Sequence, residues 1–364
     1  MTPSPGSAIA KGRILIRATN WVGDSVLTMP AVQRLREWAP SAHIALQCPA
    51  KLGDLWRHNP HLNEILTGVA DLRAGQFDLT VIFPNSFRSA WECWRAGIPR
   101  RVGFAGHWRR GLLTDVVAEP VNERPTYRSI TVGGRTFKTK YFPVIRHQIH
   151  HYLDLVGNLG GSREPVPPRI WLAPGESAAF AKFQLKPDPQ TFGIHAGAEF
   201  GPARCWLPER FAEVAARVIE TTGCQCLLFG GPGEIKAVAA IAALLRQRLP
   251  DSNQIVNVAG QTTLLELCEL LQSCRVLLTN DTGPMHMAGA LGTPVVVTTG
   301  STAAQQTGPL DPRSCVLNAG VECSPCFLRE CPIDFRCMNR ITIEQVTDVV
   351  LKIWNDPHTH NHCG

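Results

Sequence analysis

The regular alternation of short apolar runs with amphipathic segments constrains the fold of this chain most. "RILIR" (13–17), "HIALQC" (43–48) and "LTVIFP" (79–84) are continuous apolar runs of the kind that form buried parallel strands. An amphipathic helix is predicted within "PAVQRLREWAP", where Val32, Leu35 and Trp38 share one stripe. Strands that alternate with helices predict an α/β fold with a doubly wound parallel sheet.

The second half repeats this order. "TFGIH", "CQCLLF", "QIVNV", "CRVLL" and "VVV" predict strands, and "LPERFAEVAARVIETTG" and "IKAVAAIAALLRQRL" predict helices. Between the halves, residues 157–175 are rich in glycine and proline, which is typical of an interdomain linker. We therefore expect two domains, 1–165 and 166–364, the second ending in a C-terminal helix.

Charge is distributed unevenly along the 364 residues. Residues 1–170 hold 22 Lys and Arg against 12 Asp and Glu, which gives +10, and the remainder carries −4. A basic half favours an anionic ligand, a membrane surface or nucleic acid, although a solvated surface would show the same excess. No signal peptide and no membrane-spanning segment is recognisable, so we expect a cytoplasmic protein.

Three loops of the second half follow a strand and precede a helix: 195–204, 230–234 and 279–283. Backbone N–H groups at a helix N-terminus bind anions, and Arg204 adds a cation that suits phosphate. Glu234 is a candidate acceptor for ribose hydroxyls. These features predict a nucleotide with two phosphates, although glycine-rich loops also make plain tight turns. Neither the GxGxxG pattern nor the P-loop pattern is present, which argues against a dehydrogenase and a P-loop enzyme.

Two further side chains are candidates for chemistry. Asp24 follows Gly23 at the carboxyl end of a predicted strand, where it serves either as a catalytic group facing an interdomain cleft or as a helix cap. His286 lies near the start of the helix predicted after "TNDTG", where it either contacts a phosphate or packs on a neighbouring loop.

A cluster of cysteines, "CSPCFLRECPIDFRC", has C-x2-C-x4-C-x5-C spacing: Cys323, Cys326, Cys331 and Cys337. Four thiols match the ligand count of zinc or an iron–sulfur cluster, but the short later spacings do not suit a structural zinc ribbon. We expect no metal and a cysteine-bearing loop near the site, with zinc or iron–sulfur and a redox or metal sensor as the alternatives.

Four stretches together resemble glycosyltransferase family 9, the ADP-heptose:lipopolysaccharide heptosyltransferases, and most of all its heptosyltransferase II group. They are "NWVGDSVLTMPAVQRLRE", "HAGAEFGPARCW", "TNDTGPMHMAGALGTPVVVTTG" and "CSPCFLRECPIDFRCM", and "RHQIHHYLDLVGNLG" is also similar. The resemblance implies a GT-B fold, in which two Rossmann-like domains face each other across a cleft. The N-terminal domain would receive the acceptor, and the C-terminal domain would bind the ADP-sugar.

The resemblance also implies an activity: inverting transfer of L-glycero-D-manno-heptose from ADP-heptose to heptosyl-Kdo2-lipid A, without a required cofactor. Asp24 resembles the catalytic base and Asp281 the residue that contacts heptose. Arg204 stands where the family usually has Lys. The alternatives are another family member's acceptor (that of heptosyltransferase I, a later core transferase or a protein heptosyltransferase) and a non-catalytic nucleotide-sugar-binding protein.

The expected contacts follow from these roles. The residues expected to bind the donor are Gly201, Arg204, Gly231, Glu234, Asp281, Thr282, Gly283 and His286. Those expected to bind the acceptor are Asn20, Gly23, Arg88 and Arg109. The expected partners are the phosphorylated lipid A-core acceptor and the anionic inner membrane, with no nucleic acid, so the location would be cytoplasmic and peripheral to that membrane.

Overall fold

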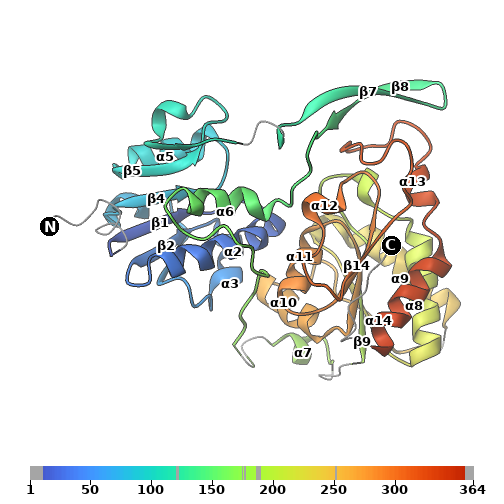
Figure 1. Ribbon diagram of the computed structural model, residues 1–364. Helices are drawn as coiled ribbons and strands as arrows, with labels where there is room; N and C mark the ends of the chain where they lie inside the picture. Colours follow the sequence, from blue (N-terminus) through green and yellow to red (C-terminus); the bar gives the residue numbers. More distant parts are fainter. Residues whose placement is uncertain are drawn as a thin grey trace. The chain divides into compact units, whose positions relative to one another are not determined.

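The computed structural model describes residues 11–119, 123–173, 175, 178–185, 190–250 and 252–356 (Figure 1). The chain forms two compact units, one from residues 1–124 and 146–171 and the other from residues 125–145 and 172–364. The boundary expected after residue 165 differs from this division in two ways. The first unit extends to residue 171, and the segment 125–145 belongs to the second unit.

The first unit is built on a six-stranded parallel sheet in the order β3-β2-β1-β4-β5-β6. Its strands are β1 (Arg13–Arg17), β2 (His43–Gln47), β3 (Glu64–Leu66), β4 (Leu79–Ile82), β5 (Arg100–Phe104) and β6 (Asp115–Val117). This is the strand order of a doubly wound Rossmann-like sheet, as the alternating pattern predicts.

The helices of the first unit include one that begins earlier than expected. They are α2 (Val22–Trp38), α3 (Gly53–Trp56), α4 (Asp71–Ala74), α5 (Phe87–Arg95) and α6 (Ile149–Gly157), with the 3₁₀ turns η1 (Ala50–Leu52) and η2 (Arg110–Leu112). The helix predicted from Pro30 onward starts at Val22, and Pro30 lies inside it. Asp24 therefore occupies the first turn of α2, where a carboxylate interacts favourably with the helix dipole.

The second unit repeats the architecture with the order β11-β10-β9-β12-β13-β14. Its strands are β9 (Thr191–His195), β10 (Gln225–Phe229), β11 (Ile255–Asn257), β12 (Val276–Asn280), β13 (Val295–Thr299) and β14 (Cys315–Asn318). Every residue of β9, β12 and β13 is buried, which fits strands covered on both faces.

Helices and turns complete the second unit. They are α7 (Ala179–Lys182), η4 (Pro202–Arg204), α8 (Pro208–Thr222), η5 (Pro232–Glu234), α9 (Ile235–Arg248), α10 (Leu264–Ser273), α11 (Gly283–Ala290), α12 (Ala304–Thr307), α13 (Arg336–Asn339) and α14 (Ile343–Asn355). Gly223 ends α8 in the left-handed conformation, with φ of 69°, as the sequence predicts for a helix that stops at glycine. Among the described residues, no helix has both the length and the apolar character needed to cross a bilayer.

A hairpin of the second unit was not expected from the sequence. Strands β7 (Thr126–Val132) and β8 (Arg135–Tyr141) pair in antiparallel register around Gly133 and Gly134, both with positive φ. Val132 packs into the core of the second unit, and Arg135 donates to the backbone oxygen of Pro332 at 2.7 Å. These contacts explain why this segment groups with the second unit although it precedes α6 in the sequence.

Candidate functional site

Three loops of the second unit lie together because β10, β9 and β12 are neighbours in a parallel sheet. The fully buried side chain of Asn280, at the end of β12, joins the loop after β12 to the loop after β9. Its Nδ2 donates to the backbone oxygen of Ala196 at 2.7 Å, and its Oδ1 accepts from the backbone N–H of Trp206 at 2.9 Å and from Thr298 Oγ1 at 3.0 Å. Asn280 is not among the predicted site residues, although it stands inside the "TNDTG" stretch. It fixes the loops that carry the predicted ones.

Arg204 and Asp281 meet at this edge of the sheet. Arg204 Nη1 lies 3.7 Å from Asp281 Oδ2, and its guanidinium carbon lies 4.2 Å from the centre of the Phe200 ring. Asp281 is buried and also accepts from Thr307 Oγ1 at 3.1 Å. The predicted cation and the predicted heptose-contacting carboxylate are therefore brought together, and Asp281 holds Arg204 in place.

The Glu234 carboxylate is engaged by its own loop. Its Oε2 accepts from the backbone N–H of Gly231 at 2.7 Å and lies 3.3 Å from Nε2 of the buried His195. Burial opposes ionisation of Glu234, but His195 and the Gly231 N–H outweigh it and lower the pKa of the carboxyl below its usual value. Gly231 and Glu234, both predicted to bind the donor, lie on this loop. The Gly231 N–H donates to the Glu234 carboxylate, so this amide is not available to a phosphate.

The N-terminus of α11 follows β12 directly. Thr282 precedes the helix in an extended conformation, Gly283 is its first residue and Pro284 stands in its first turn, where the missing N–H of proline costs no hydrogen bond. His286, the fourth residue of α11, is half-buried. The local sequence thus places a helix N-terminus, the part of a helix that favours anions, beside Arg204 and Asp281.

Gly201 connects the donor-side loop to the cysteine segment. Its φ of 151° lies in the region that favours glycine, and a Cβ there would stand 2.6 Å from the backbone oxygen of Arg329. The same oxygen accepts from the N–H of Ala203 at 3.0 Å. The loop that presents Arg204 therefore rests on the backbone of the segment between Cys326 and Cys331.

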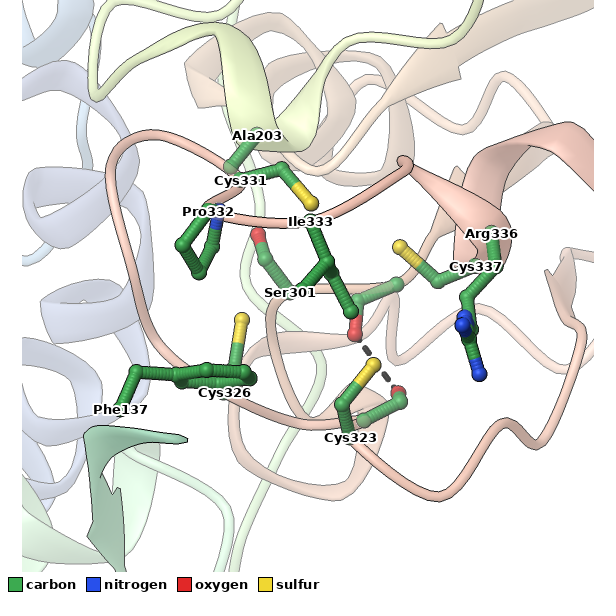
Figure 2. Close-up of a pocket in the computed structure, with 12 residues that line it drawn as sticks. Phe137, Ala203, Ser301, Cys323, Cys326, Cys331, Pro332, Ile333, Arg336 and Cys337 are labelled. Atoms are coloured by element: carbon green, nitrogen blue, oxygen red, sulfur yellow. Dashed lines mark hydrogen bonds between the residues drawn. The ribbon is translucent and has the colours of Figure 1, made fainter. Parts of the chain in front are cut away.

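The four clustered cysteines line one cavity behind this loop, together with Phe137, Ala203 and Ser301 (Figure 2). Their thiols are free, and Figure 2 shows the sulfur atoms directed toward the same space. Burial raises the pKa of Cys337 to about 11, so this thiol stays protonated at neutral pH. Within the described parts of the chain, no three His, Cys, Asp or Glu side chains are placed to hold a metal ion.

Asp24, the predicted base, is held in the first unit by a residue that the sequence did not single out. Gln148, which precedes α6, donates from Nε2 to Asp24 Oδ1 at 2.9 Å and to the Tyr152 hydroxyl oxygen at 3.0 Å. Burial, together with the Asp24 carboxylate, raises the pKa of Tyr152 above its usual value. The two amide hydrogens of Gln148 are thus both used, which fixes the orientation of the amide toward Asp24.

The predicted acceptor contacts divide into exposed and buried residues. Asn20 is exposed and Gly23 is half-buried beside Asp24, at the carboxyl end of β1. The Arg88 side chain is 82% exposed and donates to Glu92 Oε1 at 2.8 Å, while Arg17 donates to the other oxygen of that carboxylate at 3.2 Å. Arg88 is therefore positioned at the surface by a buried carboxylate and remains accessible to an anionic ligand.

Arg109 differs from this expectation, because its side chain is fully buried. Its guanidinium donates to the backbone oxygens of Phe104 (at 2.7 Å) and Pro84 and to Ser89 Oγ at 3.3 Å. Burial lowers the pKa of Arg109 to about 10. These contacts join the loop after β5 to the start of α5 and leave Arg109 a structural role there.

Comparisons with known proteins give one consistent family. The model of glycosyltransferase family 9 (heptosyltransferase) matches residues 136–335. Lipopolysaccharide heptosyltransferase 2 of Escherichia coli is 30% identical over 328 residues, which cover 84% of this chain and 87% of that protein. Lipooligosaccharide heptosyltransferase 2 of Haemophilus ducreyi is 28% identical over 335 residues, which cover 84% of this chain and 88% of that protein.

A solved structure agrees with both. The structure of E. coli ADP-heptose lipopolysaccharide heptosyltransferase II is similar with a TM-score of 0.77 and 26% identity, covering 95% of this chain and 100% of that one. The two Rossmann-like sheets described above, together with this similarity, confirm the predicted GT-B class. The chain belongs to glycosyltransferase family 9, the heptosyltransferases.

Proposed function

We propose that this chain transfers L-glycero-D-manno-heptose from ADP-heptose to the inner core of lipopolysaccharide, adding the second heptose to heptosyl-Kdo2-lipid A. The names of its relatives support the donor and the acceptor class. The observation that carries the proposal is the Asp24 carboxylate, which Gln148 holds in the first turn of α2 in a chain of this family.

Asp24 acts as the general base in this proposal. It takes the proton of the acceptor hydroxyl while that oxygen forms its bond to the anomeric carbon of heptose. The bond from that carbon to the phosphate oxygen breaks on the opposite side, and ADP leaves with the electron pair. Because attack and departure occur on opposite faces, the configuration of the anomeric carbon inverts.

The diphosphate is stabilised by the second unit. The N–H groups at the start of α11, at Thr282 and Gly283, and the guanidinium of Arg204 offer charge and donors to the negative charge that develops on ADP. Arg204 offers a planar fork where the family usually has the point charge of Lys, so it suits two phosphate oxygens at once. Asp281 orients Arg204 and contacts the heptose, and Glu234 and His195 shape the wall for the nucleoside.

The acceptor is taken by the first unit, at Asn20, Gly23 and Arg88. Its phosphorylated lipid A core complements the excess of basic residues in positions 1–170. Because the acceptor is anchored in a bilayer, we propose that the enzyme works as a peripheral protein at the cytoplasmic face of the inner membrane. The reaction as written uses no resident metal or other cofactor.

The decisive experiment measures ADP release and acceptor mass. Purified protein receives ADP-heptose and, separately, lipopolysaccharide acceptors truncated before and after the first heptose. We expect a mass gain of one heptose only on the acceptor that already carries one, with equal activity after dialysis against EDTA. The Asp24→Asn variant should lose at least a hundredfold in kcat and still bind ADP-heptose in calorimetry.

The matched control is Asp348→Asn, which makes the same change at an exposed aspartate of α14. It should keep full activity. Heptose gain on the other acceptor would assign a different member of the family. Binding of ADP-heptose without any transfer would mean a nucleotide-sugar-binding protein, and full activity of Asp24→Asn would remove Asp24 as the base.

A further inference from the structure

Helix α5 exposes several large aromatic side chains on its outer face. Its inner face buries Ser89, Ala90, Glu92 and Cys93. Its outer face exposes large aromatic residues: Phe87, Trp91 and Trp94 are 48%, 37% and 51% exposed. Their spacing of four and three residues places them on one side of the helix. The inner face thus packs Ala90 and Cys93 into the core of the first unit, and the outer face still exposes three aromatic rings that no described core residue covers.

A further exposed aromatic residue, Trp108, lies on the loop after β5. Trp108 is 96% exposed, and it and His107 both adopt positive φ, of 62° and 54°. Non-glycine residues seldom adopt this conformation, and here two do so in succession. Arg109 holds this loop against the start of α5 through its bond to Ser89 Oγ at 3.3 Å. The loop thus presents Trp108 to solvent from a firmly attached base.

Positive charge accompanies these rings. Residues 84–114 contain six arginines and a single acidic residue, Glu92, which is buried. Arg95 lies over the Trp91 ring, with 5.1 Å from the guanidinium carbon to the ring centre. We define the α5 surface by its exposed side chains: Phe87, Arg88, Trp91, Trp94, Arg95, Trp108 and Arg110.

We infer that the α5 surface docks the enzyme onto an anionic lipid bilayer. Tryptophan prefers the interface between headgroups and hydrocarbon, and arginines near it attract anionic headgroups. A bilayer suits both kinds of side chain, because it offers an apolar layer to the aromatic rings and phosphate groups to the arginines close to each other. Charge complementarity and exposed aromatic rings therefore favour a bilayer over a second copy of this basic surface, which would repel itself.

The position of the α5 surface agrees with the place where a lipid-anchored acceptor is needed. Phe87 begins α5 after β4, the strand that pairs with β1, with Arg17 opposite Ile82. Asp24 follows β1 at that same carboxyl edge of the sheet. Docking at α5 would hold the acceptor sugar near Asp24 while its acyl chains stay in the bilayer. This step rests on the proposed function, whereas docking itself does not require it.

The test is flotation with vesicles that contain no acceptor. One set consists of phosphatidylcholine, and the other also contains about one third phosphatidylglycerol. The wild-type protein should float with the anionic vesicles and much less with the neutral ones. Trp94→Ser/Trp108→Ser should lower partitioning about tenfold, and Arg95→Glu/Arg110→Glu should lower it at least tenfold on anionic vesicles and remove the preference for them.

The matched control, Tyr127→Ser/Arg246→Glu, changes one exposed aromatic residue and one exposed arginine of the second unit and should partition like wild type. All variants should keep kcat on an acyl-free, water-soluble acceptor. Unchanged flotation of both α5 variants, or no flotation of the wild type, would overturn the inference. So would a variant that alters only the oligomeric mass in light scattering, since the surface would then bind a second copy. Flotation without heptose transfer would refute the proposed function and leave docking intact.

Discussion

Gln148 offers the sharpest test of how this enzyme holds its base. Its amide donates to Asp24 Oδ1 at 2.9 Å and to the Tyr152 hydroxyl oxygen at 3.0 Å. A hydrogen bond to a charged group contributes about 1.5–3 kcal/mol. Replacement by the similarly sized leucine removes this donor and leaves the carboxylate less stable relative to its protonated form.

The expected size of the effect follows from that energy. Because 1.36 kcal/mol corresponds to one pH unit, Gln148→Leu should move the acid limb of kcat/KM upward by about 1–2 pH units. Gln148→Glu places a second carboxyl group against Asp24 and should move the limb further. The pH of the acid limb should therefore be highest in Gln148→Glu, intermediate in Gln148→Leu and lowest in wild type. This order is expected if Gln148 positions and stabilises the base.

The assay is ADP release as a function of pH, with soluble acceptor and saturating ADP-heptose. Gln33→Leu is the matched control, because Gln33 of α2 also donates to a carboxylate, that of Glu37 at 3.0 Å, away from Asp24. A general loss of folded protein would lower activity at every pH without moving the limb. An acid limb that stays in place in both Gln148 variants would refute the positioning role.

Two further predictions concern stability. Gly201→Ala adds a Cβ 2.6 Å from the Arg329 oxygen at a φ of 151°, so it should destabilise by about 1–3 kcal/mol and weaken ADP-heptose binding in calorimetry, whereas Gly233→Ala, with nothing within 4 Å, should do neither. His151 stacks on Phe104, and burial lowers its pKa from 6.5 to about 4. As pH falls from 7 to 5, His151 therefore takes up a proton in the unfolded chain but not in the folded one. The free energy of unfolding should fall by about 2 kcal/mol over this range. Urea unfolding should show this loss in wild type and not in His151→Gln, and equal slopes in the two proteins would contradict it.

Strands such as β1, β4, β9 and β12 could be predicted from the sequence because burial on both faces leaves a continuous apolar run, whereas β3, β5, β6 and β14 were not predicted. The hairpin β7–β8 carried a usable signal as well, the pair Gly133–Gly134 between the runs "TYRSITV" (126–132) and "RTFKTKY" (135–141). No local sequence signal indicated that this hairpin belongs to the second unit, because the contact of Arg135 with Pro332 joins residues far apart in the chain. The start of α2 was misplaced because Pro30 reads as a helix start, while the structure accommodates it inside the helix.

Side-chain roles were harder to predict than elements. Arg109 and Arg88 look alike in sequence, but one is fully buried and the other 82% exposed. Glu234 follows a glycine-rich strand end as a ribose-binding carboxylate would, yet it also stands three residues after Gly231, the spacing at which a glutamate caps its own turn. Local sequence does not decide between these outcomes, because each depends on which distant backbone groups come near.

In each unit, one buried polar side chain holds separate loop segments together by hydrogen bonds to their backbones. In the first unit Arg109 satisfies backbone oxygens on two separate segments, and in the second Asn280 bonds to the segments around Ala196 and Trp206. A buried polar group is stable only when its partners are in place, so each of these residues couples the order of one loop to that of another. The loop that carries Arg204 and the loop that carries Asp281 are therefore held together by buried hydrogen bonds. Gln148 and Asn280, which were not among the predicted site residues, likewise make buried or half-buried contacts that hold Asp24 and the loop carrying Arg204.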